Sequence, residues 1–320
     1  MVNKEVTYKA AFENKRNRLK EKERQRDMML AAAYETNPRL KEIESSLASI
    51  GASLAITAIS GNTEKLVEMQ KKAQLLSVEK QDILKRAQVP EIVYECDICS
   101  DTGLVSGKIC NCIKKEAGNI MLQQLSREMP IDSCSFDNFS LKYYKDTGEK
   151  TATNPKRRMT SILKLCKEYV INFDVENSKN LLFMGNAGLG KTHLTMAIVA
   201  GVIEKGYLPV YGSADNLFTR IEEEKFSGEG KGTYDTVLNC DLLVIDDLGT
   251  EMVTSFTRSV LYNLVNTRLL SRKPTIINTN LTMKEIAEKY TERIASRLIG
   301  EYDCNRFLGD DIRQQKLLNK

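Results

Sequence analysis

The 320-residue sequence lacks any uninterrupted apolar run of the roughly 18 residues that a membrane helix requires. Its first residues, MVNKEVTYKAAFENKRNRLK, contain no apolar region of the kind found in signal peptides. Internal repeats and low-complexity tracts are also missing. These absences argue against a membrane-spanning or exported protein and favour a cytoplasmic one. The apolar content of 42% is enough for a sizeable core in more than one domain.

A strong overall charge is also missing, because the net charge at pH 7 is only +4. The charge is nevertheless unevenly placed: residues 1–90 carry a net +5 and the remaining residues a net −1. Any electrostatic preference for an acidic partner therefore lies in the N-terminal part. A solvated helix face explains the same basic residues equally well.

The eight cysteines do not form the spread pairs typical of a secreted disulfide protein. Four of them fall within 17 residues in the stretch CDICSDTGLVSGKICNC. Such clustering without an export signal indicates a metal site rather than disulfides. The scattered ones are expected to be small core residues: Cys134, Cys166, Cys240 and Cys304.

The spacing within the cluster favours a structural zinc site. A C-x₂-C pair lets two thiolates face one ion, and the C-x-C pair completes a four-sulfur tetrahedron with no position left for a substrate. The intervening glycines suit a short hairpin. A [4Fe–4S] cluster is the alternative. The predicted ligands are Cys96, Cys99, Cys110 and Cys112.

Three helical stretches are predicted in the N-terminal part. Residues 9–27 are so highly charged that little of this helix is expected to be buried without a partner. Two apolar stripes with helical spacing then flank Gly61-Asn62, which predicts an antiparallel helical hairpin. The stripes either pack on each other or dock on a partner. They comprise Leu40, Ile43, Leu47, Ile50 and Leu54, and Leu66, Met69, Ala73, Leu76, Ile83 and Ala87.

Residues 117–155 are mostly polar and are predicted to form a linker, anchored by Phe136, Phe139 and Tyr143. From about residue 156, short apolar runs alternate with helix-length stretches. This alternation predicts an α/β fold with a parallel sheet covered by helices on both faces. The runs are at residues 181–184, 207–211, 242–245 and 275–277.

The stretch GNAGLGKT follows the first of these runs and precedes a helix, which is the context of a phosphate-binding loop. Glycines let backbone N–H groups approach phosphate oxygens, and the next helix directs its positive end at the same anion. Lys191 is expected to reach the β- and γ-phosphates, and the Thr192 hydroxyl to coordinate Mg²⁺. His193 is expected mainly to pack. The predicted nucleotide-binding residues are Gly185, Asn186, Ala187, Gly188, Leu189, Gly190, Lys191, Thr192 and His193.

Two acids at the end of a second apolar run, in DLLVIDDLGTE, are expected to serve the same site. Carboxylates there are costly to desolvate unless they meet a cation, so Asp246 is the predicted magnesium-side group. Asp247 would orient or deprotonate the attacking water. Asn280 ends a third strand and is a candidate for contacting the γ-phosphate or that water. Three arginines, Arg293, Arg297 and Arg313, are candidates for stabilising transferred phosphate, with surface salt bridges as the alternative role.

Taken in order, LLFMGNAGLGKTHL, LLVIDDLGTE, IINTNLT and ERIASRL resemble the bacterial replicative-helicase loaders of the DnaC/DnaI type, which are AAA+ ATPases. The cysteine stretch after a helical segment is similar to Gram-positive and phage members. The resemblance implies a Walker B pair at Asp246 and Asp247 and a sensor-1 residue at Asn280. It also implies an arginine finger at Arg297, with Arg293 as its competitor, and a sensor-2 residue at Arg313.

The resemblance further implies an ATP-dependent loader that places a replicative helicase on single-stranded DNA, with ATP, Mg²⁺ and Zn²⁺ as cofactors. Self-association would occur through the ATPase domain. Many AAA+ proteins have Asp-Glu where this chain has Asp246-Asp247, so slow hydrolysis is expected. Because few residues follow Arg313 in this sequence, a sizeable helical lid is not expected. The predicted parts are a helical partner-binding segment (1–90), a zinc knuckle (91–116), a linker (117–155) and an AAA+ ATPase domain (156–320).

Two rival functions share some of these features. A transposition helper has a similar ATP-binding core, although the cysteine knuckle is not expected in it. A zinc-stabilised adaptor with a vestigial ATP site is the other alternative, and intact Lys191, Thr192 and Asp246 argue against it. Within the ATPase domain, Lys225 and Lys231 are candidate DNA contacts in a loop that is also acidic.

Overall fold

The computed structural model describes residues 4–60, 63–128, 131–149, 153–227 and 232–318. The chain divides into two compact units, which are described separately: residues 12–108, and residues 1–11 together with 109–320. None of the described helices is long and apolar enough to cross a membrane.

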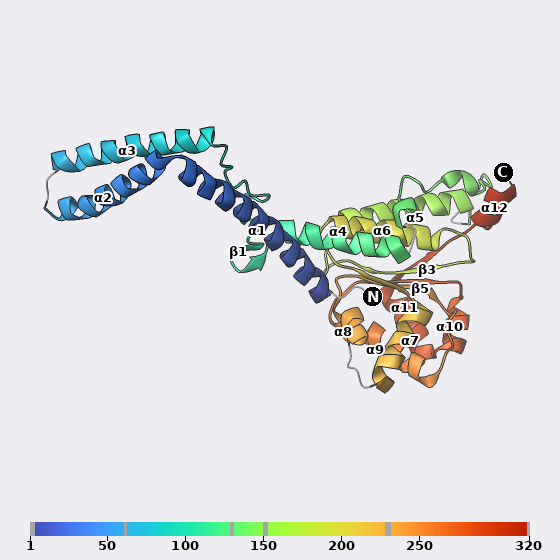
Figure 1. Ribbon diagram of the computed structural model, residues 1–320. Helices are drawn as coiled ribbons and strands as arrows, with labels where there is room; N and C mark the ends of the chain where they lie inside the picture. The colour runs from blue at the N-terminus through green and yellow to red at the C-terminus, as the bar shows by residue number, and fades with distance from the viewer. Residues whose placement is uncertain (1–3, 61–62, 129–130, 150–152, 228–231, 319–320) are drawn as a thin grey trace. The chain divides into compact units, whose positions relative to one another are not determined.

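The unit of residues 12–108 is mainly helical. It contains most of α1 (Lys4–Thr36), followed by α2 (Pro38–Ser60) and α3 (Thr63–Arg86). Helices α2 and α3 lie side by side and antiparallel (Figure 1), as the two apolar stripes predict. The turn predicted at Gly61-Asn62 lies outside the described residues.

Charged side chains join α2 to α3 along the exposed edge of this hairpin. Arg39 donates to both carboxylate oxygens of Glu79, over 2.8 and 3.1 Å, and Lys80 lies 3.0 Å from Glu44. All four side chains are largely or partly exposed, so water screens these pairs and they contribute little free energy. Leu40 and Ile43, which have no exposed surface, supply the apolar contact instead.

Helix α1 buries little of its charged stretch, as expected, because Ala11 and Lys15 are its only buried residues between 9 and 27. The Lys15 side chain is only 5% exposed, because its ammonium group lies 2.9 Å from the buried carboxylate of Asp101. The same carboxylate accepts hydrogen bonds from the backbone N–H groups of Glu95 and Cys96. Arg18 donates to Glu95 over 3.1 Å. The charged helix therefore holds the chain that enters the cysteine-rich stretch.

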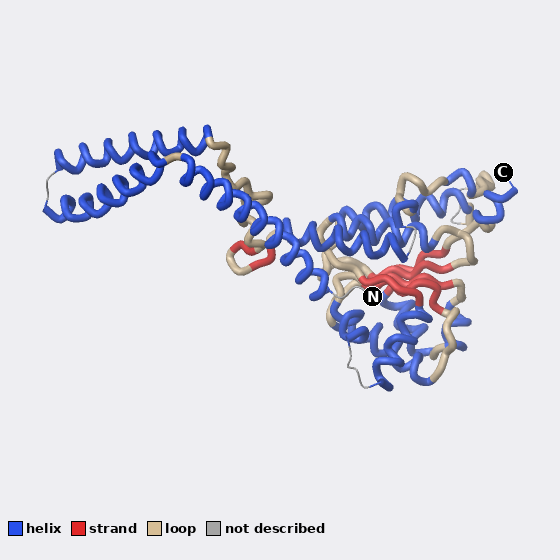
Figure 2. The backbone as a smooth tube through the Cα atoms, in the orientation of Figure 1, coloured by secondary structure: helices blue, strands red, loops and turns tan. Residues whose placement is uncertain are grey.

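The second unit is built on a sheet of five parallel strands in the order β4-β5-β6-β3-β7 (Figure 2). Register pairs such as Leu182 with Ile277 and Ile245 with Ile277 place fully buried aliphatic residues side by side. The strands are β3 (Asn180–Met184), β4 (Val210–Ser213), β5 (Leu243–Leu248), β6 (Thr275–Thr279) and β7 (Tyr302–Arg306).

Helices cover both faces of the sheet, as predicted (Figure 1). One face carries α4 (Asn111–Glu128), α5 (Pro155–Ile171) and α6 (Lys191–Glu204). The other carries α7 (Ala214–Ser227), α8 (Gly232–Asn239), α9 (Ser255–Leu270), α10 (Met283–Lys289) and α11 (Glu292–Glu301), and α12 (Ile312–Leu318) ends the described chain.

Two features differ from the sequence-based expectations. Strand β7 was not predicted, because YDCNR at the edge of the sheet has no apolar run. The segment expected as a linker contains the last two-thirds of α4 and two 3₁₀ helices, at Ile131–Ser133 and Leu141–Tyr143. In α4 a stripe at four-residue spacing is buried: Ile113, Ala117, Met121 and Leu125. The predicted domain boundaries stay predictions.

Candidate functional site

The loop between β3 and α6 depends on glycine at two crowded positions. Gly188 has a φ of +76°, and a Cβ there would lie 2.0 Å from Oδ1 of Asp311. Gly190 has a φ of +86°, and its Cβ would lie 2.8 Å from the ring of Phe139. A side chain at either position would meet both backbone strain and a steric clash. The loop is therefore held between two segments that are far apart in the sequence.

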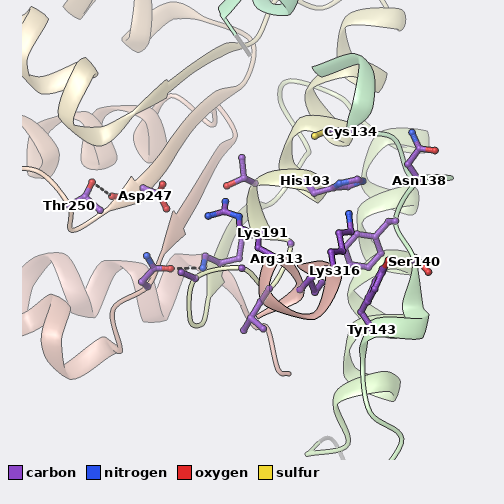
Figure 3. Close-up of a pocket in the computed structure, with 18 residues that line it drawn as sticks. Cys134, Asn138, Ser140, Tyr143, Lys191, His193, Asp247, Thr250, Arg313 and Lys316 are labelled. Atoms are coloured by element: carbon purple, nitrogen blue, oxygen red, sulfur yellow. Dashed lines mark hydrogen bonds between the residues drawn. The ribbon is translucent and has the colours of Figure 1, made fainter. Parts of the chain in front are cut away.

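The side chain of Lys191 is buried at the start of α6 and points back at this loop. Its ammonium group, which Figure 3 shows beside Arg313, donates to Oδ1 of Asn280 over 2.6 Å. It also donates to the carbonyl oxygens of Gly185 and Asn186, over 2.6 and 2.9 Å. Burial lowers the pKa of Lys191, and the nearby charges of Asp247 and Asp246 oppose that shift. The site thus contains a positive charge whose present hydrogen-bond acceptors are two loop carbonyl oxygens and the Asn280 side chain. Phosphate oxygens could take the place of these acceptors.

Asp246 lies at the end of β5 and is only 4% exposed. Its Oδ2 atom accepts a hydrogen bond from the Thr192 hydroxyl over 3.0 Å. The structure therefore brings together the hydroxyl and the carboxylate that the sequence indicates for magnesium. Oxygen donors of this kind are the ligands that Mg²⁺ prefers, so the two residues fit the ion.

Asp247 follows on the same strand, half-buried and with a left-handed φ of +52°. Burial raises the pKa of Asp247 and repulsion from Asp246 raises it further, while Lys191 and Arg313 lower it. This combination of a buried acid and nearby cations is typical of functional sites. Asp247 and Arg313 both line the cavity described next.

A cavity of about 360 Å³ lies over the loop, and most of the predicted site residues line it. In Figure 3, Asp247 and Thr250 lie on one side and Asn138, Ser140 and Tyr143 on the other, with Lys191 and Arg313 between them. The predicted residues in the lining are Ala187, Gly188, Leu189, Gly190, Lys191, Thr192, His193, Asp247, Asn280 and Arg313.

The side of the cavity opposite Asp247, called here the wall of residues 134–143, is not predicted by the sequence analysis. It comes from the segment predicted as a linker, whose aromatic anchors were the one available signal. His193, the only histidine, fastens this wall: its Nε2 lies 2.8 Å from the carbonyl oxygen of Ser135, and its ring packs on Phe139. The Tyr144 hydroxyl donates to the carbonyl oxygen of Leu189 over 2.9 Å. The missed lining residues are Cys134, Asn138, Phe139, Ser140, Tyr143, Thr250, Ile312 and Lys316.

The structure does not place the two arginines of α11 in this cavity. Arg297 lies with its guanidinium group 5.6 Å from the centre of the Tyr262 ring, and Arg293 is exposed. Neither residue is among the described residues that line the cavity.

The remaining predicted positions have mixed outcomes. Cys166 and Cys240 are buried, as expected of core residues, whereas Cys134 and Cys304 are only partly buried and Cys134 lines the cavity. The Lys225 ammonium group lies 4.7 Å from the centre of the Phe256 ring, a contact within the protein. Lys231 lies outside the described residues.

The four clustered cysteines converge as the spacing predicts. Their sulfur atoms all lie within 4.8 Å of one another. A tetrahedral zinc site with zinc–sulfur bonds of about 2.3 Å needs sulfur atoms about 3.8 Å apart, so the cluster fits the ion with little adjustment. Strands β1 (Leu104–Val105) and β2 (Lys108–Ile109) form the expected short hairpin between the two pairs. The cluster consists of Cys96, Cys99, Cys110 and Cys112.

Comparison with known proteins gives one sequence family, described as IstB-like ATP binding protein, which matches residues 156–314. Replicative helicase loader DnaC of Escherichia coli K12 is 26% identical over 171 residues, which cover 52% of this chain and 63% of that protein. Replicative helicase loader DnaC of Buchnera aphidicola (subspecies Acyrthosiphon pisum) is 27% identical over 187 residues, covering 57% of this chain and 70% of that protein.

Among solved structures, the crystal structure of the DnaC helicase loader is 26% identical, with a TM-score of 0.46, over 54% of this chain and 98% of that one. The crystal structure of DnaI is 20% identical, with a TM-score of 0.46, over 57% and 92%. The family match supports ATP binding by residues 156–314, and the relatives support the resemblance to DnaC-type AAA+ loaders.

Metal analysis of the purified protein should find about one zinc per chain, because four thiolates complete a tetrahedral site. Cys99→Ser should lose the metal, whereas Cys304→Ser, which changes a partly buried cysteine outside the cluster, should retain it. Iron absorption in the visible range, or a metal-free protein with intact thiols, would contradict the zinc assignment.

Asp247→Asn should stabilise the protein without nucleotide while slowing hydrolysis. The raised pKa of Asp247 means that folding disfavours its ionised form, so the charge destabilises the folded protein above the ordinary aspartate range. We expect the Tm at pH 7 to rise by about 1–3 °C, and this gain to shrink as the pH falls towards 4. Hydrolysis should slow by about 10²-fold or more if Asp247 serves as the base.

Calorimetry at several pH values, together with phosphate release, measures both effects. The exposed Asp137→Asn provides the matched control and should change neither. A lower Tm for Asp247→Asn at pH 7 would contradict the predicted sign.

Proposed function

We propose that this chain, whose residues 156–314 match the IstB-like ATP-binding family, is an ATP-dependent loader that assists the placement of a replicative DNA helicase on single-stranded DNA. The observation that carries the proposal is the convergence of Lys191, Thr192 and Asp246 at one end of a parallel sheet. The DnaC relatives supply the link to helicase loading. The E. coli relative matches this chain over 63% of its own length, so partners and activity of the whole chain belong to the proposal.

ATP would bind with its phosphates over the loop from Gly185 to Gly190. Lys191 would exchange its contacts with loop carbonyls and Asn280 for phosphate oxygens, since a charged acceptor gives the stronger hydrogen bond. Asn280 would then be released to contact the γ-phosphate or the attacking water. Magnesium, when bound near Thr192 and Asp246, would neutralise part of the phosphate charge.

Asp247 would orient the attacking water, and its position in the cavity lining together with Lys191 supports this role. Arg313 lines the same cavity and would act on the nucleotide of its own subunit. Arg297, outside that lining, would act on the nucleotide of a neighbouring subunit. Hydrolysis would therefore require self-association, which suits a protein that assembles before it releases a partner.

The helicase would be bound by the helical unit and the cysteine cluster. The exposed surface of α3 supports a binding role, because Val67, Leu75 and Val78 are more than half exposed on it. Large apolar side chains on such a surface are common where partners bind. Zinc would contribute by fixing the fold of the stretch around the cluster.

A transposition-helper role is the second candidate, because the matching family is the IstB-like one. It shares ATP binding and self-association with a loader but does not require a helicase. The contact between Thr192 and Asp246 supports a working ATP site. It therefore argues against the third candidate function, an adaptor whose ATP site is vestigial.

The test is co-purification with a replicative helicase, with and without ATP, followed by a loading assay on single-stranded DNA. The full chain should bind the helicase and assist loading only with ATP. Lys191→Ala should bind at most weakly to ATP and fail to load. ATP hydrolysis without any helicase binding would favour the transposition-helper role, and no hydrolysis with stable helicase binding would favour the adaptor.

Arg297→Ala should retain ATP binding. Its rate of hydrolysis, in the range where that rate depends on protein concentration, should fall by about 10³-fold, because an arginine supplied by a neighbouring subunit stabilises charge in the transition state. Arg293→Ala, four residues away on α11, is the matched variant and should keep most of this activity. The reverse result would assign the finger role to Arg293.

A further inference from the structure

A buried polar side chain lies inside the sheet beside the proposed magnesium site. Asn278 belongs to β6, has no exposed surface, and follows the apolar residues Ile276 and Ile277 along the strand. Burying an amide costs free energy unless both its donor and its acceptor are hydrogen-bonded. Both groups of Asn278 have partners, and one of these partners is Asp246.

The Asn278 amide group donates from Nδ2 to Oδ1 of Asp246 over 2.7 Å. On its other side, Oδ1 of Asn278 accepts a hydrogen bond from the buried Thr195 hydroxyl of α6 over 3.0 Å. If the amide were turned over, its oxygen would face a carboxylate oxygen, and the two acceptors would repel. Thr195 and Asp246 thus fix the orientation of the amide from opposite sides.

Asp246 is held from the other neighbouring strand as well. The Tyr211 hydroxyl of β4 donates a hydrogen bond to Oδ2 of Asp246. The backbone N–H of Asp247 is a further donor, to Oδ1, over 3.0 Å.

The two carboxylate oxygens of Asp246 accept hydrogen bonds from different groups. Oδ1 is occupied by Asn278 and by the backbone of Asp247, whereas Oδ2 faces the Thr192 hydroxyl and Tyr211. A carboxylate with donors from both neighbouring strands cannot rotate without losing several buried hydrogen bonds. Its Oδ2 atom therefore remains directed at Thr192.

We propose that Asn278 is a positioning residue, which with Thr195 and Tyr211 holds the Asp246 carboxylate in the orientation that binds the magnesium of the nucleotide. The inference rests on the proposed ATP-dependent function and names residues beyond its phosphate-binding loop and acidic pair. Asn278 and Tyr211 hydrogen-bond to Asp246 directly, and Thr195 hydrogen-bonds to Asn278, so these residues act through Asp246.

The experiment measures how nucleotide affinity of the full chain depends on magnesium, with ATP titrated at a series of Mg²⁺ concentrations and in EDTA. Asn278→Leu, which keeps the approximate size, should raise the Mg²⁺ concentration for half-maximal enhancement of binding by about tenfold, as loss of a residue behind a metal ligand typically does. Affinity for ATP in EDTA should be unchanged.

Asn305→Leu is the matched control. Asn305 is also a buried strand asparagine, but its amide donates to Asp303 on β7 rather than to Asp246. It should leave the magnesium dependence unaltered. Thr195→Val, which replaces a hydroxyl with a methyl group, and Tyr211→Phe, which removes a hydroxyl, should also raise the magnesium requirement, by a smaller factor. They keep the test decisive if Asn278→Leu does not fold.

A magnesium dependence identical to that of the unaltered chain in the folded variants would overturn the inference, as would an equal loss of affinity in EDTA. A chain that binds ATP with the expected magnesium dependence but never hydrolyses it would leave the positioning role standing and reject the ATPase proposal. Unaltered protein whose ATP binding ignores magnesium would overturn the positioning role.

Discussion

Two opposite charges buried at one end of an apolar sheet constrain much of the second unit. Lys191 and Asp246 are only 5% and 4% exposed, and isolated charges at such depth would cost several kcal/mol each. Each charge is therefore surrounded by hydrogen-bonding groups: loop carbonyls and Asn280 around the ammonium, and hydroxyl, amide and backbone donors around the carboxylate. The arrangement keeps a positive charge and a negative charge buried at the same end of the sheet.

The glycine loop is shaped as much by its neighbours as by its own sequence. Asp311 lies against Gly188, and Phe139 lies against Gly190. The loop is therefore covered by one segment that precedes the sheet strands in the sequence and by another that follows them. The backbone N–H of Ile312 also donates to the carbonyl oxygen of Gly188 over 3.0 Å. A nucleotide that enters the cavity would therefore contact the wall of residues 134–143 and the start of α12, in addition to the loop.

The unit of residues 12–108 also contains a buried charge that is surrounded by hydrogen-bonding partners. Asp101 is buried because it accepts from two backbone N–H groups and from Lys15. This aspartate links the N-terminal helix to the chain that leads into the cysteine stretch. The highly charged helix α1 thus contains a charged residue, Lys15, that is buried and holds Asp101 in place.

The sequence by itself determined the parallel α/β fold, the glycine-rich loop after β3, the acids of β5, the helical hairpin and the cysteine cluster. Each is a local pattern: apolar runs, helical spacing, or a few residues within one short stretch. It did not reveal β7, because a polar edge strand has no such pattern, nor the wall of residues 134–143. Asn278 and Tyr211 were equally hidden, since they lie 32 and 35 residues from Asp246. Only the strand order β4-β5-β6, which the packing of the whole sheet decides, brings their side chains to the same carboxylate.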